Sequence, residues 1–196
     1  MRKLKIIDHI SLDGVIQSGP DKDGDYPYGD WSGPYRTPEG LAMVLEEWGE
    51  RFDVLIGRVT YDQWSSFWPQ APKGFLMADR LNAATKFVVT HRPESLKWGP
   101  VECVGPDLVE GVRRIKATEG PNLILSGSST LTSPLLEQGL VDEMLLLVNP
   151  VLLGKGKRIF AEGTPPRAFE FVSTKVSPTG IMINKYKFEG ALRNLR

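Results

Sequence analysis

Three short segments of the chain carry residues that suit phosphate binding. Arg58 follows a glycine in the sequence GRVT, a threonine, a histidine and an arginine occupy 90–92, and small residues fill 127–130. Hydroxyl, imidazole and guanidinium groups donate hydrogen bonds, and the free N–H groups at a helix start favour an anion. Each segment taken alone also fits a plain structural role, such as a helix cap or a surface pair of Arg58 with Asp62.

An apolar run precedes each of these segments and predicts the strand that positions it. The runs lie at 53–57, 86–90 and 123–125, and a fourth run at 4–10 opens the chain. Short bounded apolar runs are typical of buried parallel strands. Because the carboxyl ends of parallel strands share one edge of a sheet, where α/β proteins bind ligands, the three segments are expected to meet there.

Helices are predicted between these strands. Thr37 and Pro38 form a cap and a first helical position, and apolar residues at helical spacing follow them. Further helices are expected at 58–64 and 108–117. A proline inside a helix loses a backbone bond, so the regular helix after 127–132 is expected to begin near Ser133, with Pro134 first.

The last third of the chain predicts strands without helices. An apolar stretch at 141–153 indicates one long strand with a break at Pro150, and 169–174 and 181–188 indicate a closing antiparallel hairpin. The fold class is therefore α/β, with a mostly parallel central sheet and an antiparallel C-terminal edge.

The segment 17–36 is rich in Gly, Pro and Asp, yet it contains Tyr26, Tyr28, Trp31 and Tyr35. Loops of this length are often lids or binding loops, and aromatic residues argue against disorder. Local packing over the core or in a dimer contact explains the rings equally well.

Composition excludes several classes of protein. The 196 residues fit a single domain spanning 1–196, and 24 basic residues balance 24 acidic ones, so neither nucleic acid nor a membrane surface is an expected partner. One cysteine and two histidines exclude a disulfide framework and the usual metal sites. Without a signal peptide or a membrane span, a cytoplasmic protein with a small-molecule ligand is expected.

The motifs SLDG, LIGRVTYDQW, VVTHRP and LILSGSSTLTSPLLEQGLVDE occur in this order along the chain. Together they resemble the dihydrofolate-reductase-like superfamily, and most closely the branch related to the reductase domain of the riboflavin-biosynthesis bifunctional deaminase-reductase. The resemblance implies a three-layer α-β-α sandwich and an NADPH-dependent reductase. It covers essentially the whole chain, and the GSSTL turn with its helix is the most specific part.

The resemblance also implies which residues hold the cofactor. The pyrophosphate and the adenosine phosphates would lie against Gly57, Arg58, Val59, Thr60, Thr90, His91, Arg92, Gly127, Ser128, Ser129, Thr130 and Leu131. Among these, 90–92 would flank the 2′-phosphate, and the arginines there favour NADPH over NADH because the extra phosphate needs cationic donors.

The substrate and the proton donor are less determined. Asp13, beside the expected nicotinamide, is the leading candidate acid and Glu39 the second, although an Asp-Gly pair also makes an ordinary turn. Folate reductases carry an acid on the first helix where Gly40 stands here, so a small pyrimidine or pterin-type heterocycle is expected instead of folate. A non-catalytic nucleotide-binding or assembly protein and a flavin-binding oxidoreductase remain alternatives. The long apolar stretch 144–153 predicts a homodimer.

Overall fold

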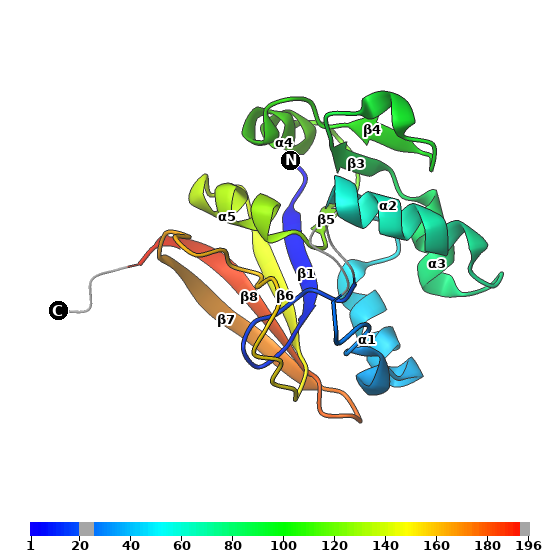
Figure 1. Cartoon of the computed structure of the whole chain (residues 1–196). Helices are drawn as coiled ribbons and strands as arrows, with labels where there is room; N and C mark the ends of the chain where they lie inside the picture. Colours follow the sequence, from blue (N-terminus) through cyan, green and yellow to red (C-terminus); the bar gives the residue numbers. More distant parts are fainter. Residues whose placement is uncertain (20–25, 193–196) are drawn as a thin grey trace.

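The computed structural model describes residues 1–19 and 26–192, and within them one mixed sheet forms the centre of the molecule. Its strands lie in the order β4-β3-β2-β5-β1-β6-β8-β7 (Figure 1). The first six run parallel to one another, while β8 pairs antiparallel with both β6 and β7. The strands are β1 Leu4–Ile10, β2 Asp53–Gly57, β3 Lys86–Val89, β4 Val101–Cys103, β5 Leu123–Leu125, β6 Glu143–Val148, β7 Arg167–Val176 and β8 Met182–Ala191.

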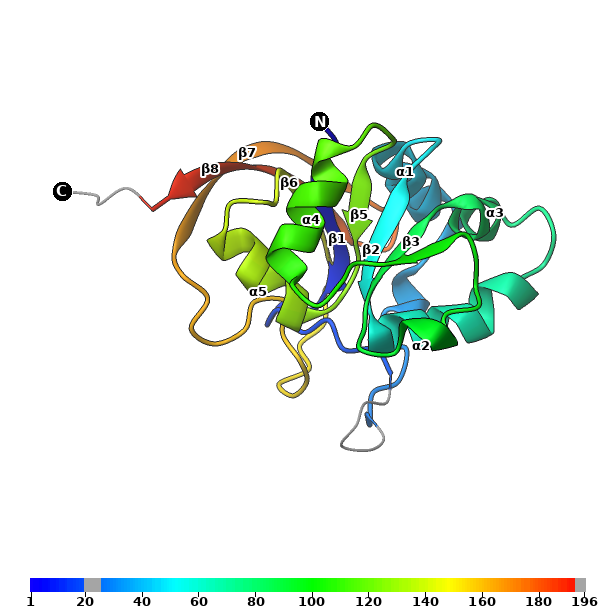
Figure 2. The ribbon, with the colours of Figure 1, turned by 90° about the horizontal axis from the view of Figure 1, so that it is seen from above.

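Helices cover both faces of the parallel part of this sheet (Figure 2). They are α1 Pro38–Trp48, α2 Arg58–Phe67, α3 Leu76–Ala83, α4 Leu108–Ala117 and α5 Ser129–Glu137, with short 3-10 turns at Gly33–Tyr35, Trp68–Gln70 and Pro93–Ser95. One buried apolar cluster joins α1, α2 and α3 to the first face, and a second joins α4 and α5 to the other. The predicted three-layer α/β fold with an antiparallel edge is confirmed.

The helix starts follow from local chemistry. Thr37 Oγ1 accepts the N–H of Gly40 at 3.1 Å, with Pro38 at the first helical position. Asp107 caps α4 in the same way through the N–H of Glu110. The Thr37 cap lies where the sequence predicts it, because a cap needs only residues that are neighbours along the chain.

The predicted start of the helix after β5 is wrong. Helix α5 begins at Ser129, not near Ser133, and Pro134 lies inside it. The proline costs this helix one backbone bond, on the order of 3 kcal/mol in a helix interior. Leu131, Leu135 and Leu136 are all buried in the core, at about 2 kcal/mol each, and this burial outweighs the loss.

The predicted strand at 141–153 forms only in its first part, since β6 runs from Glu143 to Val148 and ends just before the predicted break at Pro150. Val151 and Leu153 turn away from the sheet and pack against the cluster of Val15, Tyr26 and Trp31. The four residues 144–147 are at most 8% exposed within the single chain. These four residues need no second subunit to bury them, whereas Leu152 further along the stretch is 72% exposed. The homodimer stays a prediction.

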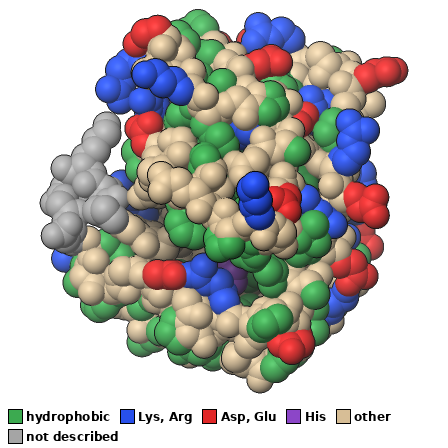
Figure 3. All heavy atoms as spheres, turned by 90° about the vertical axis from the view of Figure 1, so that its right-hand side faces the viewer, with side chains coloured by type: hydrophobic (Ala, Val, Ile, Leu, Met, Phe, Trp, Pro, Cys, Tyr) green, Lys and Arg blue, Asp and Glu red, His purple; other side chains and the backbone are tan. Residues whose placement is uncertain are grey.

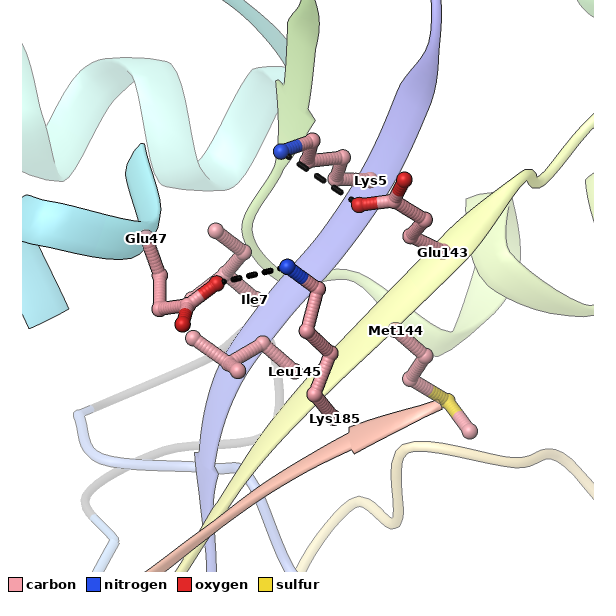
Figure 4. A pocket seen from close by; sticks show the side chains of 7 residues that line it. All are labelled: Lys5, Ile7, Glu47, Glu143, Met144, Leu145 and Lys185. Carbon is pink, nitrogen blue, oxygen red and sulfur yellow. Dashed lines mark hydrogen bonds and ion pairs between the residues drawn. The ribbon is translucent and has the colours of Figure 1, made fainter. Parts of the chain in front are cut away.

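Ion pairs occupy the end of the sheet where β1 and β6 begin. Lys5 faces Glu143 at 3.3 Å, and Lys185 of β8 faces Glu47 of α1 at 2.9 Å (Figure 4). The crevice between them has a volume of about 10 Å³, room for one water molecule at most. These contacts attach α1 to the sheet and leave the opposite end as the place for a ligand. No helix within 1–19 and 26–192 is both long and apolar enough to cross a membrane.

Candidate functional site

The carboxyl ends of β2 and β5 stand side by side, and each leads directly into a helix. A Cβ atom built on Gly57 would lie 3.7 Å from the side chains of Ser128 and Leu131. A Cβ atom on Gly127 would lie 3.3 Å from Thr60 Oγ1. The starts of α2 and α5 are therefore in contact across the sheet edge, as the sequence predicts for these segments.

The backbone at this edge offers free donors. In the described chain, the N–H groups of Ser128, Ser129 and Thr130 have no hydrogen-bond partner, whereas that of Leu131 bonds to Ser128 O at 2.9 Å. Leu131 itself is buried in the core. Unpaired N–H groups and the positive ends of two helix dipoles suit a phosphate or pyrophosphate.

Gly127 is suited to this turn by its conformation. Its φ angle is +58°, which lies in the left-handed region that favours glycine. The closeness of Thr60 leaves little space for a side chain there. The glycine thus lets two helix starts approach one another and keeps the space in front of their N–H groups open.

Arg58, at the start of α2, connects the segment 90–92 after β3 to the two helix starts. Its Nε bonds to Asp62 at 2.9 Å, while Nη1 reaches Arg92 O at 3.3 Å and the Ser95 hydroxyl. The predicted surface pair with Asp62 therefore forms, and the same guanidinium also fixes the loop after β3. Most of the donors of Arg58 are taken, so its main effect is to position that loop.

The loop after β3 presents the predicted cationic side chain. Thr90 is buried and its Oγ1 accepts the N–H of Arg92 at 3.1 Å, whereas His91 and Arg92 are exposed. The Arg92 guanidinium makes no ion pair with any described residue. It is therefore available to an anion that binds at this rim.

A cavity of about 360 Å³ opens in front of the two helix starts. It is lined by Asp8, Ile16, Gln17, Ser18, Gly19, Val59, Thr60, Gln63, Trp64, Ser126, Gly127, Ser128, Ser129, Thr130 and Lys157. Six of the predicted cofactor residues thus line it. Arg58 and Arg92 lie beside it, on the loop side of α2.

Asp8 is the acid of this cavity, and the sequence analysis did not select it. Both carboxylate oxygens lie 3.0 Å from the N–H of Gly127, and Ser126 Oγ lies 3.2 Å from Oδ1. Burial raises the pKa of Asp8 to about 7, although these hydrogen bonds oppose the rise. A carboxyl group with this pKa is half protonated near neutral pH, as a general acid requires.

Asp13, the leading acid of the sequence analysis, does not line the cavity. Its carboxylate accepts hydrogen bonds from the Ser11 hydroxyl at 2.6 Å and from the N–H groups of Leu153 and Gly154 at 3.2 and 2.8 Å. These bonds, led by that of Ser11, lower the pKa of Asp13 to about 2. Through these hydrogen bonds Asp13 holds two loops together. It cannot act as the acid, because a group with so low a pKa holds no proton at neutral pH.

Replacing Asp13 by Asn should therefore reduce stability and leave the chemistry intact. The folded-state pKa lies below the usual 3.8, so the charged carboxylate stabilises the fold above that pH, and the contribution disappears as pH falls towards 2. Urea unfolding near pH 7 should show a loss on the order of 1 kcal/mol. A loss of kcat larger than tenfold with unchanged stability would instead restore Asp13 as the acid.

Glu39 is also remote from the cavity lining. It lies exposed in the first turn of α1, where a negative charge favours the helix start. A Cβ atom on the neighbouring Gly40 would lie 3.6 Å from Ser177 Cβ. This distance is an ordinary van der Waals contact, so the structure itself does not explain why glycine stands at position 40.

The aromatic loop packs locally. The Tyr26 hydroxyl donates to Lys155 O at 2.9 Å, and Trp31 Nε1 donates to Gln17 O at 2.6 Å. Both rings are buried against Val15. Of the two interpretations of this loop, local packing holds for Tyr26 and Trp31. Residues 20–25 of the loop lie outside the described residues.

Among the described residues, no group of three or more His, Cys, Asp or Glu side chains could hold a metal ion.

The chain matches one protein family and is similar to several known proteins. A family model described as the RibD C-terminal domain matches residues 4–183. Uncharacterized protein YyaP of Bacillus subtilis (strain 168) is 26% identical over 184 residues, which are 92% of each chain. Among solved structures, a putative riboflavin biosynthesis protein from Shewanella sp. PV-4 superposes with a TM-score of 0.70 at 24% identity, over 95% of this chain and 99% of the other.

A longer protein shares the same fold over part of its length. The diaminohydroxyphosphoribosylaminopyrimidine deaminase/5-amino-6-(5-phosphoribosylamino)uracil reductase of Thermotoga maritima superposes with a TM-score of 0.60 at 18% identity. The match covers 95% of this chain and 56% of that one. At this level of identity the likeness concerns the fold.

Proposed function

Because the chain belongs to the family of RibD C-terminal domains, we propose that it is an NADPH-dependent reductase of a small heterocyclic substrate of the pyrimidine or pterin type. The observation that carries the proposal is the position of Asp8 in the cavity, directly beside the free N–H groups of the α5 start. An anion-binding backbone and a carboxyl group of pKa about 7 thus face one space.

The residues at the rim fit a dinucleotide. The N–H groups of Ser128, Ser129 and Thr130 would hold the pyrophosphate, together with the α2 start at Val59 and Thr60. Arg92, with His91 and Thr90 beside it, would hold the 2′-phosphate, and Arg58 would keep their loop in place. When bound, NADPH supplies a hydride to an electrophilic carbon atom.

Asp8 completes the reduction on the protein side. As hydride adds to the carbon of a C=N or C=O group, the nitrogen or oxygen gains negative charge, and the Asp8 O–H donates its proton to that atom. Asp8 is left as a carboxylate, which the Gly127 N–H and the Ser126 hydroxyl stabilise until a proton returns from water. Ile16, Val59 and Trp64 form the apolar part of the wall and restrict water.

The proposal is tested by NADPH oxidation with a panel of pyrimidine, pterin and quinone compounds. The expected result is oxidation with at least one pyrimidine or pterin and faster turnover with NADPH than with NADH. Tight NADPH binding without oxidation of any compound would favour the non-catalytic nucleotide-binding protein. Yellow colour on purification, from bound flavin, would favour the flavin-dependent class.

We retain the homodimer as part of the proposal on a different surface. The strand β7 at the edge of the sheet exposes Phe171 and Val172, at 58% and 48% of their full area. A long edge strand with exposed apolar side chains readily pairs with a second chain. Sedimentation at micromolar concentration should give twice the chain mass, and Phe171→Lys should shift it to the monomer. A wild-type monomer would contradict the homodimer.

A further inference from the structure

His9 follows Asp8 on β1 and therefore points to the opposite face of the sheet, since side chains alternate along a strand. The face of Asp8 carries α4 and α5, and the face of His9 carries α1. Both residues lie near the carboxyl end of the strand, at the proposed active-site rim. His9 is thus a second polar residue at this end of the sheet, although it does not line the cavity of Asp8. It makes no ion pair with any described residue.

The neighbour of His9 determines where the ring proton lies. Nδ2 of Asn149 donates to Leu147 O at 2.8 Å and to Ile10 O at 3.2 Å, so this atom is the amide nitrogen and not the oxygen. The same nitrogen lies 3.2 Å from His9 Nδ1. This nitrogen has two hydrogens and three acceptors within reach, and since it cannot accept, a bond to His9 requires Nδ1 to be the acceptor.

The ring is also neutral. Burial lowers the pKa of His9 to about 4, and the positive charge of Arg36 adds to the effect, whereas the negative charge of Asp30 opposes it. A neutral imidazole with an accepting Nδ1 carries its one proton on Nε2. His9 is therefore a fixed N–H donor at neutral pH and does not act as a base through Nε2.

This donor has no partner in the described chain, where the bond with Asn149 is the only one recorded for the His9 side chain. The charged groups closest to it, Arg36 and Asp30, pair with each other. The molecular surface on the side of α1, α2 and α3 has a hollow between hydrophobic side chains (Figure 3). His9 is half-buried, and an N–H donor that faces solvent without a partner in the described chain can bind an acceptor atom of a ligand.

We propose that His9 Nε2–H binds a carbonyl oxygen of the substrate, and that it thereby selects heterocycles with a ring carbonyl. The inference rests on the proposed reductase function and names the substrate class for the same rim. The site would reject a ligand that presents an N–H or an ammonium group to His9, because two donors would then face each other. Asn149 is the positioning residue, since it holds the ring in the donating tautomer.

Histidine-ring ¹⁵N NMR tests the proposal on the full-length protein saturated with NADP⁺, which binds without turning over. Lumazine, a bicyclic heterocycle with ring carbonyls, is the probe, and quinoxaline, with a similar outline and no carbonyl, is the matched control. Before either is added, His9 should show its proton on Nε2. Lumazine should shift this signal and leave His91 unchanged, and quinoxaline should shift neither.

The variant His9→Phe keeps a flat ring without the N–H. It should weaken lumazine binding about fivefold to tenfold, the value of one hydrogen bond, and leave the affinity for NADP⁺ unchanged. A proton on Nδ1, an unshifted Nε2 signal, equal lumazine affinity in the variant, or no lumazine binding would each overturn the proposal. If the variant does not fold, the wild-type spectra decide alone. Failure of NADP⁺ to bind would instead count against the reductase function, and it is visible before lumazine is added.

Discussion

Replacing Asp8 by Asn is expected to lower kcat of NADPH-dependent reduction roughly 100-fold or more, which is the usual contribution of a general acid. Asn keeps the shape and can still accept the Gly127 N–H, so the cavity should keep its form while the proton is lost. Steady-state kinetics measure the effect, and Asp79→Asn on the exposed face of α3 is the control. A reduction of kcat below threefold would contradict the role of Asp8.

The pH dependence identifies the reason for this loss. The donor must be protonated, and burial raises the pKa of Asp8 to about 7, so the wild-type rate should fall as pH rises through that value. The Asp8→Asn protein should lack this step. An unchanged step in the variant would assign the titration to another group.

The free energy of unfolding gives a second test of Asp8. Here the Asp8→Asn variant should gain stability, whereas it loses kcat. The folded-state pKa of about 7 lies above the usual 3.8, so the folded protein binds more protons between these values and loses stability as pH rises through them. Asp8→Asn removes this loss, and urea unfolding should find the variant more stable by about 2 kcal/mol above pH 7, after a discount for partial exposure of the group. Near pH 5 the difference should shrink. A variant that is slower and yet more stable is the result expected when a residue is retained for function.

Replacing Arg92 by Ala is expected to weaken NADPH binding about tenfold to thirtyfold and to change NADH binding less than twofold. The exposed guanidinium has no ion-pair partner among the described residues, and a charge-assisted contact with a phosphate is worth about 1.5–2 kcal/mol. Fluorescence titration with each nucleotide measures the two affinities.

Two further variants make this result specific. Arg113→Ala removes the same charge from α4, where Arg113 pairs with Glu110, and should change neither affinity. Arg58→Ala should weaken both nucleotides, because the loop that carries Arg92 loses its bonds to Arg58. Equal losses for NADPH and NADH in Arg92→Ala would show that no 2′-phosphate is recognised there.

The parts of this fold that the sequence predicts are those with local causes. Strand β1 matches its predicted bounds, and Thr37 caps α1, because alternating burial and helix capping are visible within a few residues. The sequence does not predict helix α3, because contacts with residues outside the helix stabilise it. Lys86, buried at the start of β3, donates to the carbonyls of Leu81 and Asn82 in its last turn.

The sequence does not single out Asp8 as the candidate acid, for a similar reason. Asp8 meets Gly127 across 119 positions of sequence, and Asp13 meets Leu153 across 140. Without these contacts, an Asp-Gly turn next to a strand end is the more visible acid. One signal was present in the sequence, since Asp8 is the acidic residue of a mostly apolar central strand, where burial of a charge is costly unless it serves a function.

Hydrogen exchange with and without NADPH tests the central claim most directly, because that claim concerns three segments acting together. Saturating NADPH should slow amide exchange at 57–60, 90–92 and 127–131 at the same nucleotide concentration, with little change in the β7–β8 hairpin. Protection confined to one segment, protection elsewhere, or no protection at a concentration that gives binding would contradict the account.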